Sequence, residues 1–239
     1  MLLVPHSSFA TDSVDEILSR PGRLQADIVR DARSRPDVTL PMLELQPGDR
    51  VADIFAGGGY YSELLGAIVG DSGEVLLVNN AAYMKYAGQA LAARTRGRNI
   101  GPVTIHTREA EDLNLGENTL DAALIIMSYH DLYNVDEQGG WPKIDAQDFL
   151  SQIAKALKPG GRFLVVDHRA EAGSGSSAAQ GLHRIDMDFA KRDIQQHGLR
   201  LVGESDVLRN PDDDHSLTVF DETVRGKTDR FILVFEKEL

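Results

Sequence analysis

Three consecutive glycines, Gly57 to Gly59, stand between an apolar run at residues 50–55 and a helical pattern that begins at Tyr60. Glycine has no Cβ, so such a turn can adopt positive φ angles and let a ligand lie against the main chain. The following helix offers unpaired N–H groups and the positive end of its dipole. This order predicts a ligand-binding βα unit, although the glycines would also suit a turn that only packs helix on strand.

The alternation of apolar runs and helical patterns continues along the chain. Strands are expected at residues 50–55, 74–79, 103–106, 120–127, 162–167, 199–207 and 230–236. The run at 120–127 barely alternates, as expected for a strand covered on both faces of a parallel sheet. No helical pattern separates the last two strands, so they must pair antiparallel or lie apart. We therefore predict an α/β fold: a Rossmann-like, doubly wound, seven-stranded sheet, mostly parallel with an antiparallel terminal strand, and helices on both faces.

The residues before the first strand read as helices. Ser13 and Glu16 have capping-box spacing, and helical patterns follow at about 24–34 and 39–45. We expect residues 1–42 to form an N-terminal helical cap on one domain of residues 43–239. Residues 158–161 are expected to form a turn between a helix and the fifth strand.

Composition narrows the range of possible binding partners. The formal net charge of −12 disfavours duplex nucleic acid as the main partner. No apolar run approaches the roughly 18 residues of a membrane span, so no membrane partner is predicted. The absence of cysteine excludes disulfides and thiolate chemistry. We expect a cytoplasmic protein; the alternative is periplasmic export, if Met1 to Ala10 is the remnant of a signal peptide. The oligomeric state stays open.

In combination, three segments resemble the class I S-adenosylmethionine-dependent methyltransferases. These are Val51 to Gly59 for the first motif, Leu120 to Ile126 for the fourth strand, and Leu157 to Val166 for the passage into the fifth. In detail the chain is similar to a poorly characterised bacterial branch of predicted methyltransferases, with which it shares Ser128 to Tyr133 and His183 to Asp186. The resemblance implies an enzyme that transfers a methyl group from S-adenosylmethionine to an unidentified acceptor, which we expect to be a small molecule.

The resemblance also implies a cofactor site at the carboxyl ends of the strands, where open α/β sheets bind ligands. The implied residues are Asp53, Phe55, Ala56, Gly57, Gly59, Asn79, Glu109, Ala110 and Ser128. Two of them depart from the family pattern. Phe55 stands where the family has its first glycine, and Asn79 stands where it has an acid that binds the ribose hydroxyls. An amide can accept from one hydroxyl and donate to another, but it lacks the acid's charge.

His130 is the candidate general base, because its unperturbed pKa lies near 6.5 and the family places acceptor-side residues after the fourth strand. Asp131 or Asp167 would orient it, and we expect His130 and Asp131 to be catalytic. The alternative is a histidine that only bonds loop backbone. Three aromatic residues are candidates for an acceptor wall or for the core: Tyr129, Tyr133 and Trp141.

No metal is predicted. The run Asp212 to His215 offers oxygen ligands but lacks calcium-loop spacing, so we interpret it as a solvated loop.

Two other functions remain open. A non-catalytic module that binds S-adenosylmethionine or a nucleotide would fit the departures at Phe55 and Asn79. A nicotinamide oxidoreductase is disfavoured, because the glycines lack the G-x-G-x-x-G register.

Overall fold

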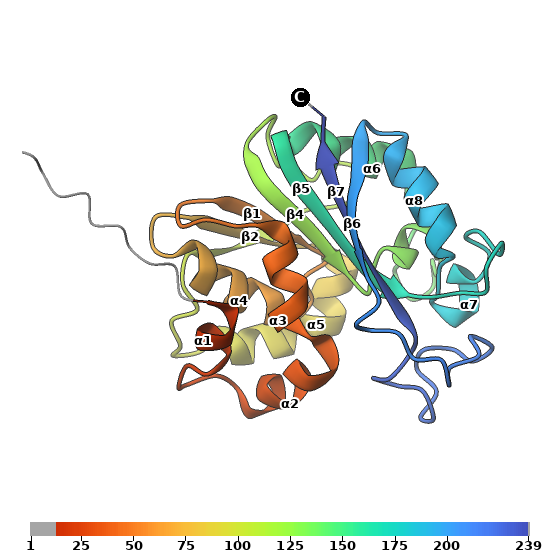
Figure 1. Ribbon diagram of the computed structural model, residues 1–239, viewed down its shortest axis with the longest axis horizontal. Coiled ribbons are helices and arrows are strands. Elements are labelled where there is room, and N and C mark those ends of the chain that lie inside the picture. The colour runs from red at the N-terminus through yellow and green to blue at the C-terminus, as the bar shows by residue number, and fades with distance from the viewer. Residues whose placement is uncertain (1–12, 239) are drawn as a thin grey trace, which may run out of the picture.

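The computed structural model describes residues 13–238, so the expectation for Met1 to Ala10 lies outside the described residues. One seven-stranded sheet has the order β3-β2-β1-β4-β5-β7-β6 (Figure 1). The strands are β1 Arg50–Ile54, β2 Glu74–Asn79, β3 Val103–Thr107, β4 Leu120–Ile126, β5 Leu157–His168, β6 Leu199–Ser205 and β7 Arg230–Lys237. Only β7 runs antiparallel to its neighbours, β5 and β6. This confirms the predicted sheet and the antiparallel pairing of the last two strands.

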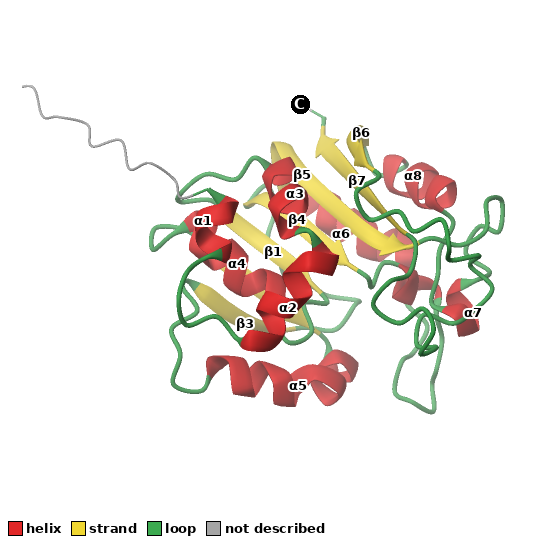
Figure 2. Cartoon of the chain, turned by 60° about the horizontal axis from the view of Figure 1, so that its bottom comes forward, coloured by secondary structure: helices red, strands yellow, loops and turns green. Residues whose placement is uncertain are grey.

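Helices cover both faces of the sheet. They are α1 Val14–Leu18, α2 Gln25–Ser34, α3 Pro36–Thr39, α4 Tyr60–Val69, α5 Ala81–Thr95, α6 Ala146–Ala156, α7 Ala179–Leu182 and α8 Met187–Gln195, with 3-10 helices η1 Leu40–Leu43 and η2 His130–Tyr133. Figure 2 shows α2, α3 and α4 in front of the sheet and α6 behind it. Separate apolar clusters pack on the two faces, one around Leu65 and the other around Phe149. No helix within residues 13–238 has the length and apolar character that a membrane crossing requires.

The N-terminal helices belong to the packed structure. The Ser13–Glu16 capping box is present, as predicted: each side chain bonds the other residue's backbone N–H. Ile17 is buried in the same apolar cluster as Leu64 of α4. The proposed boundary at residue 43 stays a prediction.

Two local predictions are wrong. The helix expected at 39–45 is a short α3 followed by the 3-10 helix η1, because Arg35 breaks the helical path with φ of 46° and Pro41 lacks an N–H. The turn expected at 158–161 is part of β5, because Leu157 already pairs with Leu120 before the register shifts to Ala122 and Arg162. Gly160, at φ of 79°, lies within this irregular stretch.

Candidate active site

The glycine turn connects β1 to α4 through three residues in the left-handed region. Phe55, Gly57 and Gly59 have φ values of 52°, 57° and 77°. At Gly59, the N-cap of α4, an added Cβ would lie 2.9 Å from Leu77 Cδ1, so glycine is required for space as well as for conformation. Phe55 thus occupies a glycine-like conformation that costs an L-residue about 1–2 kcal/mol.

An aromatic cluster explains how Phe55 is tolerated there. Its ring stacks on Tyr83 of α5 at 4.9 Å between centroids and on Phe149 of α6 at 5.3 Å, and meets Trp141 edge-on at 5.5 Å. Burying a phenylalanine in such a cluster contributes several kcal/mol, more than the backbone strain costs. Packing therefore outweighs strain at the start of the turn.

Asn79 at the end of β2 holds the same turn. Its Oδ1 accepts from the Gly57 N–H at 2.9 Å, and its Nδ2 donates to the Gly57 C=O at 3.0 Å. The side chain is buried and lies outside the lining of the cavity described below. In this structure the amide orders the turn through both of its polar atoms.

Arg94 of α5 holds the turn from its other side. Its Nε donates to the Gly58 C=O at 2.5 Å, and Nη1 donates to Asp27 of α2 and to Glu63 of α4, each at 2.5 Å. Arg94 is only 5% exposed. A single buried guanidinium therefore joins the glycine turn, the helix that follows it and the N-terminal cap.

A cavity of about 670 Å³ opens at the carboxyl ends of β1, β4 and β5. Of the predicted site residues, the lining contains Phe55, Ala56, Gly57, His130 and Asp131. The lining does not contain Asp53, Gly59, Asn79, Glu109, Ala110 or Ser128. The sequence-based site thus divides into residues that face the cavity and residues that lie behind or beside its wall.

The residues outside the lining have partners of their own. Asp53 is buried and accepts from the Ser62 hydroxyl at 2.6 Å; burial raises its pKa to about 7, despite the opposing effects of Ser62, Arg30 and Arg94. Glu109 accepts from the backbone N–H of Ala81 at 3.1 Å. Further bonds of this kind join the Ser128 hydroxyl to the Ile126 C=O and the Gln152 amide to the Ala110 C=O. In this structure each of these groups thus bonds a neighbouring part of the protein.

His130 lies in the cavity wall, where Asp167 at the end of β5 fixes it. Asp167 accepts from both the backbone N–H of His130, at 2.7 Å, and its Nδ1, at 2.8 Å. The Nε2 lies 3.4 Å from Asp131 Oδ1. Burial disfavours the imidazolium, but the two carboxylates outweigh burial and raise the pKa of His130. The arrangement of a histidine oriented through Nδ1 by a buried carboxylate is the one expected of a general base.

Asp131 is shared among several groups. Tyr83 donates to its Oδ2 at 2.7 Å, and His183 Nδ1 lies 3.7 Å from Oδ1. Burial would raise the pKa of Asp131, but His130, His183 and Tyr83 together lower it. One ligand atom each from His130, Asp131 and His183 falls within 4.8 Å of the others, so these are the side chains within residues 13–238 that could hold a metal ion. No metal is predicted from the sequence, and no local pattern in it places His183 beside Asp131.

The structure decides two further points that the sequence raised. Tyr129 and Tyr133 both donate to Asp193 of α8 and lie outside the cavity lining, which leaves Trp141 as the aromatic wall residue of the three.

The run Asp212 to His215 is not simply solvated. Asp213 is buried and paired with Arg184 at 2.9 Å, and His215 bonds Asp229 at 3.0 Å. This run ties down the connection between β6 and β7, which lies beside α7 in Figure 1.

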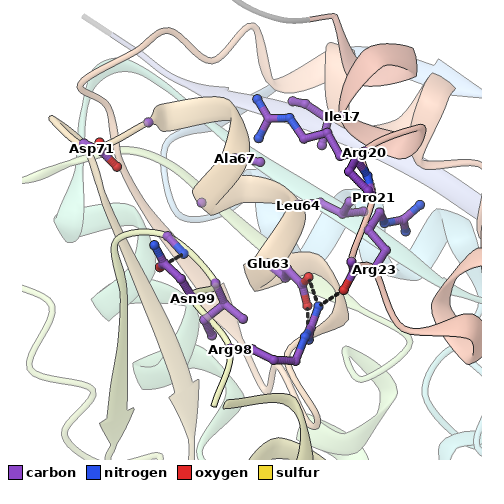
Figure 3. Close-up of a pocket in the computed structure, with 15 residues that line it drawn as sticks. Ile17, Arg20, Pro21, Arg23, Glu63, Leu64, Ala67, Asp71, Arg98 and Asn99 are labelled. Atoms are coloured by element: carbon purple, nitrogen blue, oxygen red, sulfur yellow. Dashed lines mark hydrogen bonds and ion pairs between the residues drawn. The ribbon is translucent and has the colours of Figure 1, made fainter. Parts of the chain in front are cut away.

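A second cavity, of about 590 Å³, lies among α1, α4 and residues 98–101 (Figure 3). Arg98 bonds Glu63 across it at 2.6 Å and the Gly22 C=O at 2.9 Å. Its walls include the residues that precede β2 and β3, at the amino ends of those strands. Ligands of open α/β sheets bind at the carboxyl ends, so the first cavity is the candidate active site.

The strand order, the glycine turn after β1 and the cavity at the strand ends define a class I methyltransferase fold. Residues 52–165 match the methyltransferase domain family. This match and the fold together support a class I S-adenosylmethionine-dependent methyltransferase.

Sequence relatives and solved structures agree with this assignment. The chain is 32% identical over 130 residues to the ubiquinone/menaquinone biosynthesis C-methyltransferase UbiE of Azotobacter vinelandii, and 28% identical over 130 residues to that of Teredinibacter turnerae. Each alignment covers 54% of this chain, but only 46% and 47% of the respective relative.

Among solved structures, an S-adenosylmethionine-dependent methyltransferase from Aquifex aeolicus has a TM-score of 0.59 at 17% identity, covering 90% of this chain and 99% of that one. The cyclase SpnF has a TM-score of 0.61 at 17% identity, covering 92% and 86%. At these identities the likeness concerns the fold.

Proposed function

We propose that this protein transfers the methyl group of S-adenosylmethionine to a small-molecule acceptor bound in the 670 Å³ cavity. One observation carries the proposal: the main chain of the glycine turn and His130, which Asp167 orients, line the same cavity at the carboxyl ends of the strands. A cofactor wall and a positioned base are the two parts that such a reaction needs.

The residues present fit the cofactor. Ala56, Gly57 and Gly58 offer main chain to the cavity, and Tyr83 and Ala87 of α5 form the adjoining wall. The cavity volume lies within the range of about 300–1,000 Å³ that is usual for ligand sites. When bound, the cofactor supplies an electrophilic methyl group on a sulfonium centre. The predicted roles of Glu109, Ala110 and Ser128 toward it remain part of this proposal.

His130 has the position of a base for an acceptor that loses a proton. Asp167 holds Nδ1–H, which leaves Nε2 positioned to accept the proton that the acceptor would lose on methylation. Asp131, 3.4 Å from Nε2, stabilises the resulting imidazolium. The relatives named above act as C-methyltransferases in quinone biosynthesis; carbon methylation of a small ring is one acceptor class that this base would serve.

Calorimetry tests the cofactor half of the proposal. We expect S-adenosylhomocysteine to bind the wild-type protein with a dissociation constant in the micromolar range, and His130→Ala to leave that constant unchanged within about threefold, because His130 serves the acceptor. No binding at millimolar ligand would refute the proposal. For the acceptor half, transfer of labelled methyl to quinone-type phenols should fall at least about 100-fold in His130→Ala.

Non-catalytic ligand binding is the second candidate, and the engagement of both Asn79 polar atoms by Gly57 favours it. A solved neighbour of this fold is named as a cyclase, which is not a methyl transfer. Tight S-adenosylhomocysteine binding without methyl transfer to any acceptor in a broad metabolite extract would favour this candidate over the first.

A further inference from the structure

Four arginines line the candidate cavity: Arg30 and Arg33 of α2, Arg225 in the connection before β7, and Arg230 at the start of β7. Within residues 13–238, none of the four forms an ion pair with a carboxylate, whereas the buried Arg94 and Arg184 do. The chain has 37 acidic against 25 basic side chains. In so acidic a protein, four arginines without acidic partners around one cavity are a specific feature.

Neutral groups hold these arginines in place. Arg230 is 7% exposed, and its Nη2 donates to the Arg33 C=O at 2.7 Å. The Arg30 guanidinium lies 4.1 Å from the centre of the Tyr60 ring, and its Nε donates to the Ser34 hydroxyl. The Arg33 guanidinium lies against Gly226, where an added Cβ would approach Nη1 to 2.9 Å. None of these partners cancels the positive charge.

The like charges are close enough to affect one another. Burial lowers the pKa of Arg230, and Arg30 and Arg33 lower it further, against the opposing effects of Tyr61 and Asp229. Two carboxylates share the cavity lining, but Asp131 is bonded by Tyr83 and Asp136 by the Gly139 N–H. An anion placed among the arginines would relieve their repulsion.

Arg230 lies near the candidate base. Arg230 is directly opposite His168 in the β5–β7 register. Thr228, two residues before it, bonds His168 at 2.7 Å, and the His168 ring lies 5.9 Å from that of His130. The glycine turn belongs to β1, which β4 separates from β5 in the sheet. A ligand group held by Arg230 would therefore adjoin the candidate base from the β7 side.

We propose that Arg230, Arg33 and Arg30 form an anion subsite for a carboxylate or phosphate group of the methyl acceptor, with Arg225 at its rim. The acceptor is then a small anionic molecule whose charged end is held by the arginines and whose reacting atom faces His130. This inference rests on the proposed methyl transfer for the identity of its ligand, but the subsite itself is built from residues that the proposed chemistry does not use.

The test uses inorganic phosphate as the probe and the full chain saturated with S-adenosylhomocysteine. We expect phosphate to raise the unfolding temperature more than sodium chloride of equal ionic strength does. The phosphate dissociation constant should rise at least about tenfold in Arg33→Gln and in Arg230→Gln, because each loses a charge-assisted hydrogen bond. Arg192→Gln is the matched control, since Arg192 is exposed on α8 and lies outside the lining; it should behave as wild type.

Arg33→Gln alters an exposed side chain, so it keeps the test valid if Arg230→Gln fails to fold. Equal phosphate binding in wild type and Arg33→Gln would overturn the inference. The inference would also be overturned if Arg33→Gln bound S-adenosylhomocysteine tenfold more weakly but bound methylthioadenosine, which lacks the amino-acid carboxylate, as tightly as wild type. The arginines would then hold the carboxylate of the cofactor. If S-adenosylhomocysteine fails to bind the wild type, the proposed function fails, and phosphate titration of the protein alone still decides the subsite.

Discussion

Asn79 bonds Gly57 on both sides, accepting from its N–H at 2.9 Å and donating to its C=O at 3.0 Å. A carboxylate can make only the first of these bonds and would place a charge against the Gly57 carbonyl oxygen. We therefore expect Asn79→Asp to lower the free energy of unfolding by about 1–3 kcal/mol. We also expect it to weaken S-adenosylhomocysteine binding. Urea unfolding and calorimetry measure the two effects.

Asn80→Asp is the matched control. Asn80 is the N-cap of α5, where its Oδ1 accepts from the Tyr83 N–H, and aspartate is as good an N-cap as asparagine. It should leave stability within about 0.5 kcal/mol of wild type. A gain in cofactor affinity from Asn79→Asp would contradict the structure and would indicate that this side chain turns toward the ribose.

At Phe55, backbone strain and aromatic packing oppose each other. Both Phe55→Ala and Phe55→Gly lose the stacking on Tyr83 and Phe149, which we expect to cost about 3–5 kcal/mol. Only the glycine variant relieves the positive φ of 52°, so it should be about 1 kcal/mol more stable than the alanine variant. Chemical denaturation of both variants measures this order.

Phe149 provides the reference for that comparison, because it lies in α6 with helical backbone. There the order should reverse, with Phe149→Gly about 1 kcal/mol less stable than Phe149→Ala. Finding alanine the more stable variant at both positions would mean that residue 55 does not hold its left-handed conformation in solution.

Asp53 should make stability depend on pH. Its pKa is about 7 when folded and near 3.8 when exposed, so between these values the unfolded chain has released a proton that the folded protein retains. Stability therefore falls as pH rises from about 4 to 7, by an amount on the order of 4 kcal/mol. Asp53→Asn should abolish this slope while it keeps the bond from Ser62. Urea midpoints at pH 4.5, 6 and 8 for both proteins test this, and parallel curves would contradict it.

His130 should titrate above its ordinary value. Asp167 and Asp131 raise its pKa despite burial, and its ring also faces those of His168 and His183. The imidazolium then contributes stability that is present below pH 6.5 and is lost as pH rises through the folded pKa. A catalytic rate that depends on neutral His130 would rise over the same range.

NMR titration of the His130 imidazole measures this directly and needs no acceptor. In Asp131→Asn we expect the pKa to move down toward or below 6.5, because one of the two carboxylates that oppose burial is gone. Asp136→Asn is the control, since Asp136 lines the same cavity and bonds the Gly139 N–H instead. An unchanged pKa in Asp131→Asn would mean that Asp167 alone sets the titration.

Local signals explain what the sequence could predict. The start of α4 and the bounds of β2 agree with expectation, because Gly59 precedes the helix and Gly73 precedes the strand. The orientation of His130 by Asp167 was among the expected alternatives, since adjacent parallel strands bring their carboxyl ends together.

Long-range contacts explain what was missed. The bond from Arg230 to Arg33 spans 197 residues, and no local pattern links α2 to the start of β7. His183 approaches Asp131 only because the 170–179 loop and α7 fold back over η2, where Gln180 bonds the Val135 C=O. Arg94 stands in the last turn of α5, where no local pattern shows that its side chain is buried against three other elements.

Arg94 has a thermodynamic consequence. One guanidinium bonds both Gly58 in the turn and Asp27 in α2. A ligand that orders the turn therefore also strengthens the docking of α2. Because such coupling is reciprocal, firm docking of α2 raises the affinity of the turn for that ligand. The N-terminal helices, which contribute nothing to the sheet, thus take part in setting how tightly the glycine turn holds what it binds. Evolution could adjust cofactor affinity in this protein by changing residues on a helix that lies outside the matched methyltransferase domain.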